Sequence, residues 1–393
     1  MSTVMGWFQK TVCRPLFGLA LTGLLPSALA AIELDEIHVT RPGNLLFDHA
    51  QRRETLASMA PDERAHLCGS DRHGWPEHGV VRNVYNGKQP GENVAYTLMT
   101  GAAAAFGNDD DAARTAVIDN LRRWARGGAL ERFKRNPTAT MYYNLDRTLL
   151  PVIVAFSLVQ PDMSSEDQEL IEQWLDQLVW RRGPDRERDP KRRTSRNNHR
   201  LLSDSVTMAW GALQGRDELF RAGIERYLVA IRQMRPDGSL PLETARGARA
   251  LSYQRHAIAS LVTIAEMAAA QGYDLYAVEG NGGQSIHRAI AFLLDGIDDP
   301  ELVWPYAMEN TQPGPNQNYR VQDLGFMIER GHGRHYMSWT EAYIARFPDS
   351  DIAKRLQRTL AEFGSREHPM IDDYSGGSAS CFFTQPGQAD WQS

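Results

Sequence analysis

The sequence predicts an all-α protein, and three observations support this class. Apolar residues recur at helical spacing along most of the chain, and runs with strand-like alternation are scarce. The connections are short and carry Gly, Pro and Asp, as in RPDGSLP at 235–241. Many helices of similar length joined by short turns indicate antiparallel helical hairpins. In a chain of 393 residues, such hairpins either close into an α/α toroid or pack as an irregular helical bundle.

Two segments show the helical pattern most clearly. In 109–126, an apolar stripe ends in Trp124, Asp109 and Asp110 suit the N-terminus, and Gly127 follows the last turn. In 165–180, the apolar residues share one face, and Ser165 with Gln168 resembles a capping box. Further helices are expected at about 142–158, 199–214, 217–234, 248–271, 284–296, 337–346 and 350–363. Residues 61–95 and 300–335 are rich in Gly, Pro and His, and we expect long loops or a lid there.

The first 30 residues have the pattern of a secretory signal peptide. Lys10 and Arg14 precede an apolar run that ends in Ala28-Leu29-Ala30, a typical cleavage site. We expect residues 1–30 to be removed and 31–393 to form one exported domain, periplasmic or secreted; a membrane anchor is the alternative interpretation. An exported compartment permits a disulfide between Cys68 and Cys381. The sequence leaves open whether this bridge forms.

The charge of the chain is uneven. Its net charge of −6 gives no indication of a nucleic-acid partner. The segment RRGPDRERDPKRRTSRNNHR at 181–200 nevertheless holds nine basic and three acidic residues. Such a segment either attracts a polyanion or is a solvated loop whose charges pair with one another.

Two polar segments could form a chemical site. Asn197, Asn198 and His199 open the helix expected at 199–214, where they alone would indicate a helix cap. The segment DGSLPLETARGARALSYQRHA at 237–257 places Arg246 and Tyr253 two helical turns apart, and therefore on one face.

Amide, imidazole, guanidinium and phenol groups together suit β-elimination from a uronic acid. The proton to be removed lies on C5, next to a carboxylate whose charge opposes formation of an enolate-like intermediate. An amide and a cation aimed at that carboxylate stabilise the developing charge. A Tyr hydroxyl can protonate the departing glycosidic oxygen, and either a His or the same Tyr can take the C5 proton. This chemistry does not require a metal.

Two segments resemble the alginate lyases of polysaccharide lyase family 5 and related polyuronate lyases. They are Asn197-Asn198-His199 and, further along the chain, DGSLPLETARGARALSYQRHAIASLVTIAEMAAAQGYDL at 237–275. The resemblance implies a single-domain α/α toroid with a central cleft. It also implies β-elimination of a polyuronate that leaves a 4,5-unsaturated uronate at the new non-reducing end. Asn198 and Arg246 would then neutralise the substrate carboxylate. His199 would join them or act as the base, and Tyr253 would be the general acid and, on mannuronate, also the base.

A larger set of residues is expected to contact the sugar: Asn197, Arg200, Arg249, His256, Tyr85, Lys88, Asn144 and Arg147. Arg200 replaces an aromatic or small polar residue of the family pattern, and His256 stands where a second tyrosine is common. Mannuronate-rich alginate is the expected substrate, with glucuronan or another β-linked glucuronate as the alternative, because one epimer is a pocket-level distinction.

Two other classes of protein remain possible from the sequence. A glycoside hydrolase on a similar fold would need two carboxylates flanking the scissile bond, for which Asp237 and Glu243 are available. A non-catalytic polyuronate-binding protein would keep the basic residues without needing Tyr253. In the leading interpretation, we expect a monomer that acts on an anionic polysaccharide without a metal or organic cofactor. We expect it to bind neither nucleic acid nor, once the signal peptide is removed, a membrane.

Overall fold

The computed structural model describes residues 33–69, 75–86, 91–182, 191–310, 318–328, 334–364 and 369–388. Within these ranges the chain is mostly helical, which confirms the predicted all-α class. The strands in this part of the chain are β1 (Ile371–Asp372) and β2 (Gly377–Ser378), which pair in antiparallel fashion. The expected signal peptide lies outside the described residues. No helix in the described ranges is long and apolar enough to cross a membrane.

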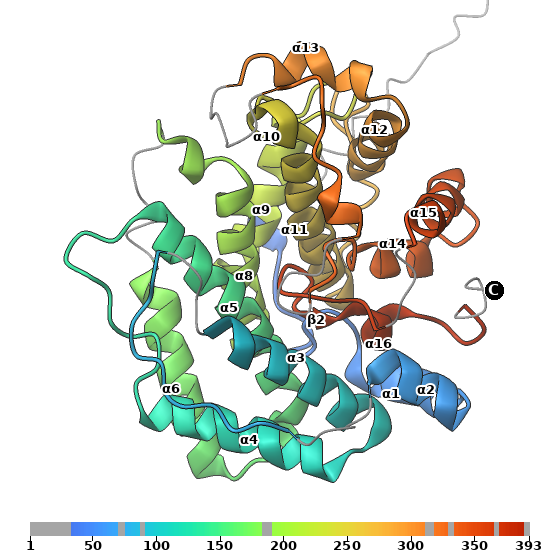
Figure 1. Ribbon diagram of the computed structural model, residues 1–393. Helices are drawn as coiled ribbons and strands as arrows, with labels where there is room; N and C mark the ends of the chain where they lie inside the picture. Colours follow the sequence, from blue (N-terminus) through green and yellow to red (C-terminus); the bar gives the residue numbers. More distant parts are fainter. Residues whose placement is uncertain are drawn as a thin grey trace, which may run out of the picture.

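Four helices form an inner layer and contact one another in succession: α3 (Gly91–Asn108), α5 (Ala139–Val159), α8 (Asn198–Gln214) and α11 (Ala250–Ala270) (Figure 1). Their residues are buried on nearly every face, as expected for helices that are covered all round. The outer layer comprises α4 (Asp111–Arg126), α6 (Ser165–Arg181), α9 (Asp217–Gln233), α12 (Ile286–Asp298) and α15 (Asp351–Glu362). These helices bury one apolar stripe each and leave a polar face in solvent.

The remaining helices are short and lie at the ends of the inner layer. They are α1 (His49–Ala57), α2 (Pro61–Cys68), α10 (Pro241–Thr244), α13 (Trp304–Ala307), α14 (Thr340–Arg346) and α16 (Ala379–Phe383). The C-terminal α16 packs on α2 (Figure 1). The disulfide that the sequence left open joins Cys68 to Cys381. A Cβ on Gly107 of α3 would lie 2.2 Å from the sulfur of Cys68, so the bridge needs a glycine there.

Each expected helix is present, with ends shifted by a few residues. Several details of the prediction were wrong. The supposed loop at 61–95 contains α2 and the first turn of α3, and the one at 300–335 contains α13. Helix α6 is capped by Ser164, whose side chain accepts a hydrogen bond from the amide of Asp167, and not by Ser165. Arg246 lies outside α11, because a 3-10 turn at Gly247–Arg249 separates the two. The apolar pattern marked the buried faces well, whereas helix ends depend on single side-chain contacts.

Candidate active site

The N-terminus of α8 is fixed by two side chains. Asn197 is the N-cap residue, and its side-chain oxygen accepts a hydrogen bond of 3.1 Å from the amide of His199. The next amide, that of Asn198, donates a hydrogen bond of 2.7 Å to the carboxyl of Glu243. Two of the amides that a helix N-terminus leaves without an intrahelical partner are therefore satisfied by side chains. The helix cap that the sequence predicted in this segment is present, and it is Asn197.

The side chain of Asn198 is fully buried, yet its side-chain amide, unlike its backbone amide, makes no hydrogen bond to any described residue. Within the described residues, neither Oδ1 nor Nδ2 has a partner. A buried polar group left unsatisfied costs about 1–3 kcal/mol, and such groups are uncommon in folded proteins. The arrangement is therefore better suited to a ligand-bound state than to the free protein.

Arg246 and Tyr253 lie against each other, as the sequence predicted, although they do not belong to one helix. The guanidinium carbon of Arg246 lies 3.5 Å from the centroid of the Tyr253 ring. The chain passes between them through Gly247, whose φ of +59° favours glycine. A Cβ there would lie 2.7 Å from the side-chain oxygen of Asn310. The Nε atom of Arg246 is buried and has no partner among the described residues.

His199 is held against an aromatic ring that sequence reasoning missed. The ring of Tyr143, from α5, stacks on the imidazole with centroids 4.2 Å apart and planes inclined by 22°. Burial, together with the nearby Arg246 guanidinium, lowers the pKa of His199 to about 4. The imidazole is therefore neutral at pH 7 and can accept or share a proton.

A second tyrosine that sequence reasoning missed connects the Tyr143–His199 stack to His256 and Tyr253. Tyr374, from the turn between β1 and β2, hydrogen-bonds through its hydroxyl to that of Tyr143. It also stacks on His256, with ring centroids 5.1 Å apart and planes inclined by 9°. His256 in turn meets Tyr253 edge to face at 5.5 Å. These contacts form a continuous series of rings from His199 to Tyr253.

An ionic cluster lies beside these rings. Arg147 pairs with Glu92 at 3.1 Å and with Asp373 at 2.6 Å, and Arg334 pairs with the same aspartate at 3.0 Å. Burial opposes ionisation of Asp373, but the two arginines outweigh it and hold the pKa of that carboxyl well below its usual range. Burial and the adjacent Asp373 raise the pKa of Asp372 well above its usual range. The cluster thus fixes Arg147 by charge pairing.

The other residues expected to bind substrate have different environments. Asn144 donates a hydrogen bond of 2.9 Å to the backbone carbonyl of Tyr85, whose side chain is exposed. Arg200 pairs with Asp204 at 2.6 Å within α8, so its charge is engaged inside the protein. Arg249 is exposed and lies 3.8 Å from the carboxylate of Asp323. Lys88 and residues 183–190 of the basic segment lie outside the described residues.

Residues 92–303, more than half of the chain, match the family described as alginate lyase. The chain belongs to the alginate lyase family. A polysaccharide lyase of Stenotrophomonas maltophilia (strain K279a) is 34% identical over 62% of this chain and 66% of its own length. An alginate lyase of Azotobacter chroococcum mcd 1 is 26% identical over 73% of this chain and 68% of its own length. These matches span about two thirds of each relative.

Solved structures of alginate lyases share the fold. The chain matches alginate lyase A1-III from Sphingomonas species A1 with a TM-score of 0.68, at 24% identity over 90% of this chain and 99% of that one. A variant of A1-III in complex with a tetrasaccharide matches with a TM-score of 0.69 at 25% identity, over 91% of this chain and 99% of that one. The fold of these neighbours is the α/α toroid that the sequence predicted.

The two carboxylates considered for a glycoside hydrolase have internal roles in this alginate lyase family member. Asp237 accepts hydrogen bonds from the Ser239 amide at 2.9 Å and from the Tyr306 hydroxyl at 2.5 Å. Glu243 binds the amide of Asn198, and burial raises its pKa to about 8. Both groups hold turns of the chain in place, so the arrangement does not favour hydrolysis by this pair.

Proposed function

We propose that this protein is a polyuronate lyase that cleaves mannuronate-rich alginate by β-elimination. The observation that carries the proposal is the buried, unpartnered side-chain amide of Asn198. It lies in the same cluster as the Arg246 guanidinium, because Glu243 binds the Asn198 amide and is also influenced by the charge of Arg246. A uronate carboxylate can accept hydrogen bonds from both groups and would satisfy them. The cost of burying these donors is then recovered when the substrate binds.

The proposed chemistry moves one proton from C5 of a uronate to the glycosidic oxygen on C4. Asn198 and Arg246 neutralise the carboxylate and so stabilise the charge that develops at C5. Tyr253, reacting as the phenolate, takes the C5 proton; the C4–oxygen bond breaks, a C4=C5 double bond forms, and Tyr253 returns the proton to the leaving oxygen. One hydroxyl serves both steps because syn elimination places the proton and the leaving group on one face. Neutral His199, which lies near Arg246, joins it and Asn198 at the carboxylate.

Two solved structures of a relative support these roles. Alginate lyase A1-III was solved with a tetrasaccharide as a Tyr→Phe variant and as a His→Ala variant. The two changed positions are separated by the same number of residues as His199 and Tyr253 in this chain. The pair of residues proposed here therefore has the chemistry and the spacing of the pair that was altered in that enzyme.

The proposal extends to where the protein works. The basic and apolar pattern of residues 1–30 and the Cys68–Cys381 disulfide both suit an oxidising, exported compartment. We therefore place the mature domain, residues 31–393, in the periplasm or outside the cell, where it would act on its polymer as a monomer.

A substrate panel read by ultraviolet absorbance tests the function, since elimination creates a conjugated double bond and hydrolysis does not. Polymannuronate should give the fastest increase in absorbance, ahead of polyguluronate, glucuronan, hyaluronan and polygalacturonate. Faster turnover of glucuronan would change the substrate and keep the reaction. A folded protein that releases no unsaturated product from any of the five polymers would overturn the lyase proposal.

The Tyr253→Phe variant tests the catalytic assignment separately. Its kcat should fall by about 10²- to 10⁴-fold, the usual contribution of a general acid or base, while polymer binding is retained. Tyr273→Phe is the matched control, because the Tyr273 hydroxyl bonds only to His38 among the described residues and lies beyond the far end of α11. Equal rates for Tyr253→Phe and wild type would remove Tyr253 from the mechanism.

A further inference from the structure

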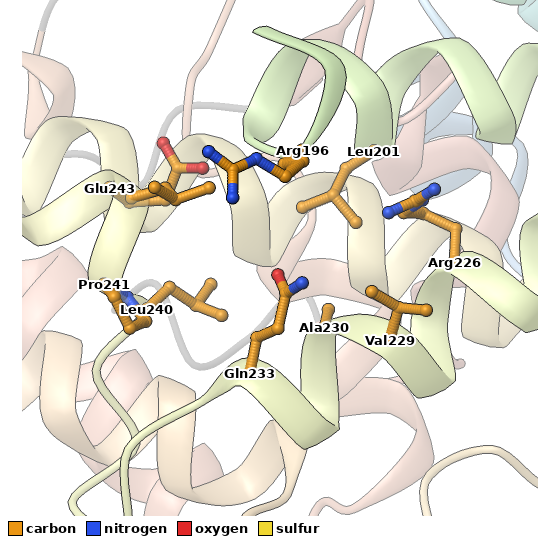
Figure 2. Close-up of a pocket in the computed structure, with 10 residues that line it drawn as sticks. Arg196, Leu201, Arg226, Val229, Ala230, Gln233, Leu240, Pro241 and Glu243 are labelled. Carbon is orange, nitrogen blue, oxygen red and sulfur yellow. The ribbon is translucent and has the colours of Figure 1, made fainter. Parts of the chain in front are cut away.

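Glu243 lies between the site and a separate pocket. Its side chain is 2% exposed, and one carboxyl oxygen accepts the 2.7 Å hydrogen bond from the amide of Asn198. The other oxygen, Oε2, is buried and has no partner among the described residues. The same residue lines a pocket of about 250 Å³ between α8, α9 and α10, in which Figure 2 shows its carboxyl near the Arg196 guanidinium.

We propose that Glu243 is a positioning residue for the elimination, holding Asn198 in place and leaving the charge of Arg246 available to the substrate carboxylate. This inference rests on the proposed lyase function. Glu243 itself does not touch the reacting atoms; it acts through its two neighbours.

The geometry explains why a carboxyl group suits this position. Asn198 is the first residue of α8, so the orientation of its backbone amide also sets the direction in which its side chain leaves the backbone. An acceptor at 2.7 Å fixes that direction, and burial of the acceptor keeps water from competing for the amide. Loss of the acceptor would leave a buried donor unsatisfied at the start of the helix and would free the first turn to move.

The protonation state of Glu243 decides whether the charge of Arg246 is compensated inside the protein. Arg246, on the same segment, is the charged group that acts on this carboxyl, and His199 is neutral. Arg196 and Arg226 also line the pocket, where Arg226 is paired with Asp204 (Figure 2). Arg246 and the hydrogen bond from the Asn198 backbone amide favour the ionised form, but burial outweighs both and raises the pKa of Glu243 to about 8. A neutral carboxyl leaves the charge of Arg246 uncompensated below that pH.

The pocket gives this proton a route that does not cross the substrate. Asn198, His199, Arg246 and Tyr253 are all absent from its lining, whereas Glu243 is part of it. In this proposal, Glu243 exchanges its proton on the side of α9 and α10, while a polymer occupies the side of the catalytic residues. Ionisation of Glu243 at alkaline pH would create an internal partner for Arg246 that competes with the substrate. We expect kcat/KM to decrease for this reason as the pH rises through about 8.

Two substitutions separate positioning from simple structural support. Glu243→Gln keeps an oxygen acceptor for the Asn198 amide and is neutral at every pH. It should keep kcat at pH 7 within about threefold of wild type and should lose the decrease of kcat/KM above pH 8. Glu243→Ala removes the acceptor and should lower kcat by about 10- to 100-fold, corresponding to a buried donor left unsatisfied. Glu225→Gln, an exposed acid on α9, is the control.

Hydrogen–deuterium exchange of the same four proteins provides a readout that does not depend on activity. The peptide covering the first turn of α8 should exchange faster in Glu243→Ala and at the wild-type rate in Glu243→Gln. Wild-type kcat and exchange in Glu243→Ala would overturn the proposal. Equal damage from both substitutions would also overturn it, because the charge and not the acceptor would then matter. If the wild type forms no unsaturated product, the lyase function fails, and the exchange data alone decide whether Glu243 holds Asn198.

Discussion

The guanidinium group of Arg246 packs on the face of the Tyr253 ring, with its central carbon 3.5 Å from the ring centroid. The ring face attracts the cation and holds the flat group in one plane. The buried Nε of this guanidinium has no partner among the described residues, so it is available to a ligand. The residue proposed to neutralise the substrate is thus oriented by the residue proposed to transfer the proton.

Arg246→Ala should lower kcat/KM on polymannuronate by about 100-fold, because the charge that stabilises the developing enolate is lost. Arg246→Lys should give an intermediate rate, since an ammonium group carries the charge but neither stacks flat nor offers two parallel donors. The rates are measured by ultraviolet absorbance. Arg232→Ala, at an exposed arginine of α9, serves as the control. A lysine variant with wild-type kcat/KM would show that the stacked geometry is unimportant.

The neutral state of His199 predicts a pH profile. Burial holds its pKa at about 4, so His199 should contribute no inflection to kcat/KM near pH 6.5, and its acid limb should lie near pH 4. Tyr143→Leu removes the stacked ring and admits water to the imidazole. The pKa of His199 should then rise toward its ordinary value, and the acid limb should move to higher pH. Titration of His199 by NMR checks this directly, and an unchanged pKa in the variant would contradict it.

Much of this site could be predicted from residues that are near one another in the sequence. Asn197 and Asn198 lie at the start of an apolar stripe, and Arg246 and Tyr253 are seven residues apart in the sequence. Each pair is identified by local spacing, which periodicity and capping preferences describe well.

Tyr143 and Tyr374 could not be predicted in this way. Their hydroxyl groups meet although the residues are separated by 231 positions, and only the closure of the fold brings them together. Helix α1 was missed for another reason: it buries Arg52 and Leu56 and has too few apolar residues for a clear stripe. Arg52 compensates by donating two hydrogen bonds to the backbone carbonyl of Cys381. Such long-range polar contacts leave no periodic pattern in the sequence.

Glu341, buried in α14, predicts a pH dependence of stability. Burial raises its pKa from the ordinary 4.5 to about 7 in the folded protein. Between these values the folded state holds a proton that the unfolded state releases, so the contribution of Glu341 to stability falls as the pH rises. Glu341→Gln stays neutral throughout. The free energy of unfolding of this variant relative to wild type should therefore increase by about 3 kcal/mol between pH 4.5 and pH 8.

Urea denaturation of both proteins across this pH range measures the effect of Glu341. Comparing variant with wild type cancels the contributions of the other titrating groups. Glu225→Gln, at an exposed position of α9, should leave the difference from wild type constant with pH. A constant difference for Glu341→Gln as well would mean that Glu341 titrates normally in the folded protein.

The Cys68–Cys381 disulfide joins α2 to α16 across a separation of 313 residues. A bridge that closes so long a loop restricts the unfolded chain strongly and typically contributes about 2–5 kcal/mol to stability. The double variant Cys68→Ala/Cys381→Ala should therefore have a lower Tm and a lower free energy of unfolding. Its kcat at 25 °C should match wild type, because Arg52 still binds the carbonyl of residue 381 and the bridge contacts none of the proposed catalytic residues. Adding a reductant should lower the Tm of the wild type and leave that of the double variant unchanged. An equal effect of reductant on both proteins would show that the stabilisation does not come from this bond.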